Sequence, residues 1–284
     1  MSINSLGVKL KFDISIELST KTTKRLYYYI VNRFFIFTWI IKDNKSCSYK
    51  LAETFKHLVC PSLEFLINSI MSRNEILLNI LTICVIIILP HTELIPNFGY
   101  SVPILLLVLI VLKYFNENFN DIGFCFKKFK PKSIIIGSLV AVLTLSFMQL
   151  IFFPTLENFI VFEGTEIGLH AFIKGNIWQY FIIIIMGWLV GGFYEEIVFH
   201  GFIFSRLEKM IKGKYATIIA FIGTAIIFGA YHYQLGVAGL INALIVGAVY
   251  LSLFLFFKRN LWYSIFCHGV YNSIVITFIY YGYL

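Results

Sequence analysis

The sequence contains little charge for its length. Only 13% of its 284 residues are Asp, Glu, Lys or Arg, whereas 59% are hydrophobic and the mean hydropathy is +0.82. A single soluble core of this size could not bury so much apolar surface. The composition therefore excludes an ordinary soluble globular protein and predicts a polytopic membrane protein.

Cysteine is also scarce, and the five cysteines show no ligand-like spacing. The sequence has no CxxC pair, and three of the cysteines lie within or beside long apolar runs. This pattern indicates neither a disulfide framework nor a zinc knuckle. No apolar run is followed by a small-residue cleavage site, so we expect no secretory signal peptide to be removed.

What the chain does have is a series of long apolar runs. A run of roughly 20 helical residues crosses a hydrocarbon core about 30 Å thick. Because the hydrophobicity is continuous and does not alternate, helices are favoured over a barrel. We predict an all-α polytopic membrane bundle of about seven transmembrane helices, near residues 75–90, 98–113, 133–154, 177–205, 215–234, 237–257 and 261–284.

The basic residues are clustered between these runs. The net charge of +8 has no aromatic and basic groove to accompany it, so we expect no nucleic-acid partner. The positive-inside rule explains the clusters at residues 127–132, 206–214 and 258–259 better. Their alternation with acidic or neutral loops predicts that Arg73 is inside and that the C-terminus is outside.

Residues 1–70 differ from the rest of the chain. The apolar stretch that begins at Leu26 contains Asn32 and Arg33, and a single span there would put its basic flank on the wrong side of the membrane. We therefore predict an N-terminal extension that is partly an interfacial helix. Residues 71–284 are predicted to form one helical membrane domain.

Two adjacent carboxylates, Glu195 and Glu196, lie inside one of the most apolar stretches. An ionised carboxylate in hydrocarbon costs several kcal/mol, so this pair needs a buried role. Glu196 and His200 are four residues apart and share a helix face, while Glu195 points about 100° away. We expect one carboxylate to face a cavity and the other a supporting partner. A structural ion pair across a helix interface is the plainer alternative.

Two further polar pairs, each one helical turn long, follow in the last apolar runs: Phe228 with His232, and His268 with Asn272. A lone His near a helix end is usually a structural residue or an interfacial anchor. An Asn in a membrane span most often forms a hydrogen bond to a neighbouring helix, a role that also suits Asn242. His and Asn on one turn, with Glu elsewhere, is what polarising a carbonyl and activating a water require.

In this order, the motifs EExxxHG, FxxxH and HxxxN resemble those of the CPBP family of intramembrane proteases, also called the Abi or type II CAAX prenyl endopeptidase family. The resemblance covers about Gly187 to the C-terminus, and FNENFNDIGF resembles the loop motif before the family's core. Where the family usually has Arg, this chain has His200, which lacks the forked donors of guanidinium. The resemblance implies a membrane protease domain over residues 71–284, with its catalytic core at about 177–284.

The resemblance also implies roles for individual residues. Glu195 would be the general base that takes a proton from a water held with His232. His268 and Asn272 would donate hydrogen bonds to the oxyanion. Glu196, the remaining member of the implied catalytic set, would support the site by fixing its helix.

Two more residues would have supporting roles. His200 would pair with Glu196, and Phe228 would begin the FxxxH motif that contains His232. The family is commonly described as metalloproteases, so a divalent metal such as zinc on Glu195, His232 and His268 is a competing arrangement. At the level of the sequence, the metal-activated and the glutamate-activated water both stay open.

The function implied is that of an intramembrane endopeptidase acting on a membrane-associated substrate, such as a prenylated C-terminus or a leader peptide. Its partners would be this peptide or protein substrate and the lipid bilayer. The main alternative is a catalytically inactive membrane scaffold, for example a bacteriocin self-immunity protein, which needs the fold but not the chemistry. The family's abundance in bacteria and the Ile-, Lys- and Asn-rich composition favour a bacterial cell membrane.

Overall fold

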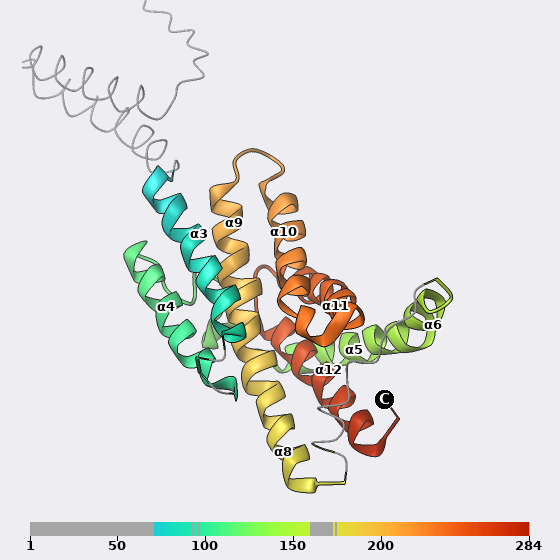
Figure 1. Ribbon diagram of the computed structural model, residues 1–284. Coiled ribbons are helices and arrows are strands. Elements are labelled where there is room, and N and C mark those ends of the chain that lie inside the picture. The colour runs from blue at the N-terminus through green and yellow to red at the C-terminus, as the bar shows by residue number, and fades with distance from the viewer. Residues whose placement is uncertain (1–70, 93, 96, 160–172, 174, 284) are drawn as a thin grey trace, which may run out of the picture. The chain divides into compact units, whose positions relative to one another are not determined.

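Figure 1 shows the computed structural model, which describes residues 71–92, 94–95, 97–159, 173 and 175–283. The extension expected over residues 1–70 lies outside the described residues and stays a prediction. Contacts divide the chain after Asn74, and the fold below is that of the unit that begins at Glu75. The described part contains helices and no strands, which confirms the all-α fold class.

The helices follow the apolar runs of the sequence. They are α3 (Arg73–Ile88), α4 (Ser101–Tyr114), α5 (Pro131–Phe147), α6 (Phe153–Leu156), α8 (Ile177–Met186), α9 (Phe204–Met210), α10 (Ala216–Tyr231), α11 (Gly236–Phe256) and α12 (Trp262–Tyr281). Short 3-10 turns between them are η1 (Leu89–His91), η2 (Asn97–Tyr100), η3 (Phe126–Lys128) and η6 (Tyr233–Leu235). Two π-helical stretches, η4 (Met148–Phe152) and η5 (Gly187–Ile203), connect α5 to α6 and α8 to α9.

Among the described residues, five continuous helices are long and apolar enough to cross a membrane: Arg73–His91, Pro131–Leu156, Ile177–Met210, Tyr233–Phe256 and Trp262–Tyr281. Two shorter apolar helices, Phe98–Tyr114 and Ala216–Tyr231, complete the seven that were predicted. Many large apolar side chains on these helices are exposed, as contact with lipid requires. The protein is therefore an integral membrane protein, and the side of the C-terminus stays a prediction.

The helices that carry the three motifs pack around a common centre. Helix α12 packs against α5 and η5, and α10 packs against α9 and α11 (Figure 1). Glycine allows the closest of these approaches. A Cβ added at Gly229 of α10 would lie 2.8 Å from the Cβ of Leu244 on α11, and one at Gly137 of α5 would lie 2.8 Å from the carbonyl oxygen of Tyr263 on α12.

Two ion-pair clusters connect loops to helix α9. In the FNENFNDIGF loop, Glu117 pairs with the buried Arg206 and also with Lys209, at 2.8 Å. Arg259, between α11 and α12, makes two 2.7 Å hydrogen bonds to the carboxylate of Glu208. The FNENFNDIGF loop is thus attached to the end of the continuous helix that carries the two adjacent glutamates.

Candidate functional site

The π-helical stretch η5 carries Glu195 and Glu196 into the interior of the bundle. All of its residues from Val190 onward, apart from Phe193, are buried. Glu196 is fully buried, and Glu195 retains 7% exposure. The two carboxylates therefore have the buried setting predicted for them, in a widened type of helix that is frequent at functional sites.

Glu196 accepts hydrogen bonds from two imidazoles. Its Oε2 lies 2.9 Å from Nδ1 of His200, and its Oε1 lies 2.9 Å from Nδ1 of His268. The pairing with His200 was predicted from their spacing, and it is present. The pairing with His268 was not predicted. Because Nδ1–H of His268 donates to this carboxylate, Nε2 of the same ring is free to face elsewhere.

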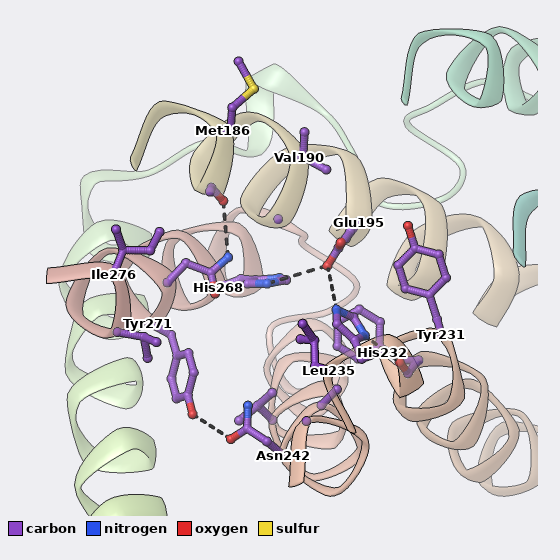
Figure 2. Close-up of a pocket in the computed structure, with 18 of the residues that line it drawn as sticks. Met186, Val190, Glu195, Tyr231, His232, Leu235, Asn242, His268, Tyr271 and Ile276 are labelled. Carbon is purple, nitrogen blue, oxygen red and sulfur yellow. Dashed lines mark hydrogen bonds and ion pairs between the residues drawn. The ribbon is translucent and has the colours of Figure 1, made fainter. Parts of the chain in front are cut away.

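Glu195 points toward a different set of partners (Figure 2). Its Oε2 lies 3.7 Å from Nε2 of His232 and 3.8 Å from Nε2 of His268. Both distances exceed those of a direct hydrogen bond. Nδ1 of His232 lies 2.8 Å from the carbonyl oxygen of Phe228, to which it donates, so this ring also presents Nε2 to Glu195. Three polar atoms from three segments of the chain therefore converge.

The convergence occurs at the wall of a cavity of about 440 Å³. Glu195, His232, His268 and Asn272 all line this cavity, whose remaining wall is mostly apolar. The Asn272 amide donates a long hydrogen bond, 3.4 Å, to the carbonyl oxygen of Gly187. Polar groups in a membrane bundle are expected to face one another or a cavity, and here they do both.

Aromatic rings hold the histidines in place. The Phe228 ring lies 5.1 Å from that of His200, 4.6 Å from that of His232 and 6.1 Å from that of His268, measured between centroids. Phe228 thus contacts the rings of all three histidines, and its supporting role stays a prediction. Tyr250 of α11 stacks on His268 at 4.5 Å and 21°. Tyr250 could not be identified from the sequence, because a single Tyr in an apolar run has no informative spacing.

The donor set includes groups that bind zinc, namely two imidazoles and a carboxylate. Each imidazole donates a hydrogen bond from Nδ1 to an oxygen, as metal-bound histidines commonly do with the nitrogen that does not bind the metal. The ligand atoms of a tetrahedral zinc lie about 3.4 Å apart, however, and the distances to Glu195 are longer. No group of three His, Cys, Asp or Glu side chains in the described ranges is placed to hold a metal ion. As arranged, these residues do not form a metal site.

Comparison with known proteins gives one match. Residues 175–274 match the family model described as Type II CAAX prenyl endopeptidase Rce1-like. No curated protein and no solved structure matches the chain. The matched segment contains both glutamates and the Phe228–His232 and His268–Asn272 pairs, so it holds the polar residues of all three motifs. The resemblance suggested by the three motifs is thereby confirmed over residues 175–274, which are similar to the Rce1-like type II CAAX prenyl endopeptidases.

Proposed function

We propose that the protein is an intramembrane endopeptidase that uses a water activated by Glu195 to hydrolyse a peptide bond. The observation that carries this proposal is the convergence of Glu195, His232 and His268 at the wall of one cavity, inside the segment that matches an endopeptidase family. A catalytically inactive scaffold would need the helices but not this convergence. We therefore favour the enzyme over the scaffold.

The water would bind between Glu195 and His232. Their facing atoms are 3.7 Å apart, so one water at about 2.8 Å from each fits at the apex of a triangle. Glu195 takes a proton from this water, and the oxygen attacks the substrate carbonyl. The same proton then passes from Glu195 to the nitrogen of the leaving amine, which completes hydrolysis and returns Glu195 to its starting state.

The negative charge that forms on the substrate oxygen needs donors in a site with little water. The Asn272 amide lines the cavity and supplies one hydrogen-bond donor. His268 supplies a second from Nε2 when its ring carries both protons, because Glu196 holds the proton on Nδ1 and balances the charge of the ring. Glu196 therefore acts as a positioning residue, and His200 shares its carboxylate.

The substrate class follows from the family description and from the cavity wall. A CAAX sequence is a prenylated Cys followed by two aliphatic residues and a C-terminal residue. Aliphatic side chains suit a cavity whose wall is mostly apolar. We therefore propose a membrane-associated peptide of this kind as the substrate, bound within the lipid bilayer.

Purified protein in detergent should release the three C-terminal residues from a farnesylated CAAX peptide, as detected by mass spectrometry. The same peptide without the farnesyl group tests whether the lipid contributes to recognition, and a bacteriocin leader peptide tests the second substrate type. If the folded, monodisperse protein cleaves none of the three peptides, the inactive scaffold would be the better explanation.

Chelation is expected to leave this activity almost unchanged. Because the proposed water is activated by Glu195 alone, 1,10-phenanthroline should change the cleavage rate by no more than about twofold. The measurement is the initial rate before and after dialysis against the chelator. A large loss that zinc restores would instead assign a metal to Glu195, His232 and His268.

Adding one methyl group at Gly191 should disturb the oxyanion donors. An ideal Cβ there would lie 2.3 Å from the Asn272 amide nitrogen and 3.2 Å from Nε2 of His268, so the amide must move. We expect Gly191→Ala to lower kcat about tenfold or more, since small misplacements of catalytic groups are costly. Gly192→Ala is the matched control, because its nearest neighbour outside the chain's own turn is 3.4 Å away. Equal losses in both variants would contradict the assignment.

A further inference from the structure

Asn242 of α11 lines the same cavity as Glu195, and its side chain is held in one orientation (Figure 2). The hydroxyl of Tyr271, a buried residue on α12, donates a 2.9 Å hydrogen bond to Oδ1 of Asn242. This bond uses one lone pair of the amide oxygen and fixes which end of the amide faces Tyr271. The NH₂ group keeps both of its donor hydrogens.

The NH₂ group of Asn242 makes no hydrogen bond to another described residue. It lies within an apolar helix long enough to cross the membrane, where an unpaired polar group is costly. A role in joining helices explains the hydrogen bond from Tyr271 to the amide oxygen, but it does not explain the two amide hydrogens of a residue that lines the cavity. Those hydrogens suit an acceptor that enters the cavity.

Another carboxamide, that of Gln149, lines the same cavity from a different helix. It lies on the π-helical stretch η4, inside the apolar helix Pro131–Leu156, and its side chain has no hydrogen bond with the rest of the described chain. Its neighbour Met148 belongs to the same packed cluster as Val246 and Tyr271, which brings this stretch close to the Asn242 side of the cavity. A glutamine side chain can both donate and accept.

We propose that Asn242 and Gln149 form a subsite that hydrogen-bonds the main chain of the substrate beside the bond that is cleaved. Asn242 would donate to a peptide carbonyl, and Gln149 would bind a peptide N–H, a carbonyl or both. A helical segment satisfies its own amides internally, whereas an extended segment presents them. The subsite therefore selects an extended apolar peptide, and this selection rests on the proposed endopeptidase function.

Peptide binding and cleavage test the subsite separately. Binding is measured in the Glu195→Gln background, with the farnesylated CAAX peptide and with analogues in which one backbone amide at a time is replaced by an ester. An ester carbonyl is a weaker acceptor, and the ester also lacks the N–H. Asn242→Leu is the test variant, and Ser252→Ala is the matched control, because Ser252 is an exposed polar residue of the same helix that bonds only to its own backbone turn.

We expect Asn242→Leu to weaken peptide binding about tenfold, and Ser252→Ala to leave it unchanged. One ester analogue should bind about fivefold more weakly than the amide peptide to protein with Asn242, and equally well to Asn242→Leu. In cleavage assays with Glu195 intact, Asn242→Leu should raise KM with a smaller change in kcat.

Unchanged peptide binding by Asn242→Leu would overturn the subsite. So would an equal loss of affinity for every ester analogue in the protein with Asn242 and in Asn242→Leu. These results are distinct from failure of the proposed function. If wild-type protein cleaves nothing while peptide binding still depends on Asn242, the endopeptidase fails and Asn242 remains only a peptide-binding residue. If cleavage requires Glu195 but is indifferent to Asn242, the endopeptidase stands and the subsite fails.

Discussion

Glu195→Gln is expected to reduce peptide cleavage by about two orders of magnitude or more. Glutamine has nearly the same shape as glutamate, so the cavity and the contacts with His232 and His268 should be retained. What it lacks is the carboxylate that takes a proton from water. The measurement is kcat for the farnesylated CAAX peptide, together with the helix content and thermal unfolding of the detergent-solubilised protein.

Glu157→Gln is the control for this change, because Glu157 is exposed and lies outside the cavity. It should cleave at the wild-type rate. If Glu195→Gln cleaved as fast as this control, Glu195 would not be the base, and the activity would require another explanation. If cells depended on the protein but tolerated Glu195→Gln fully, the inactive scaffold would be favoured.

Removing the Glu196 carboxylate should have the second largest effect. In Glu196→Ala, the Nδ1 protons of His200 and His268 both lose their acceptor in a buried setting. Each unsatisfied group costs about 1–3 kcal/mol, so the thermal midpoint should fall. Because His268 also loses the group that orients it, kcat should fall about 100-fold.

Glu196→Gln separates positioning from stability. Its amide oxygen can still accept from one of the two histidines, so kcat should recover to a value between those of Glu196→Ala and wild type, with KM unchanged. Rates are compared per folded molecule, measured from the monodisperse fraction. If kcat per folded molecule were the same in all three proteins, Glu196 would be a structural residue only.

The fold was predictable from the sequence because membrane helices need long continuous apolar runs. The run predicted over residues 215–234 became α10, which ends at Tyr231, and residues 233–235 form a separate turn. The difference matters for His232, which was placed inside a helix and instead follows its last residue. Helix ends are decided by local backbone bonds and packing, and hydropathy does not report either.

The site was predictable only in part. The Glu196–His200 pair was predictable from helical spacing alone, because residues four apart lie on one face. The bond between Glu196 and His268 joins residues 72 positions apart, so it depends on how α12 packs against η5. Asn242 was expected to join helices, and it does so through Tyr271. Gln149 and Tyr250 had no spacing signal, because each is a single residue in an apolar run.

The π-helical stretch η5 limits how this region can change in length. Its backbone bonds run from residue i to i+5, so each turn holds more residues than an α-helical turn. Trp188 near its start is fixed by a 3.0 Å hydrogen bond to Ser273, and Arg206 just beyond its end is fixed by Glu117. Deleting one residue between these anchors would rotate both glutamates relative to one of the two anchors, by somewhat less than the roughly 100° per residue of an α-helix. Insertions and deletions in related sequences should therefore avoid residues 188–206 and collect in the connections between helices.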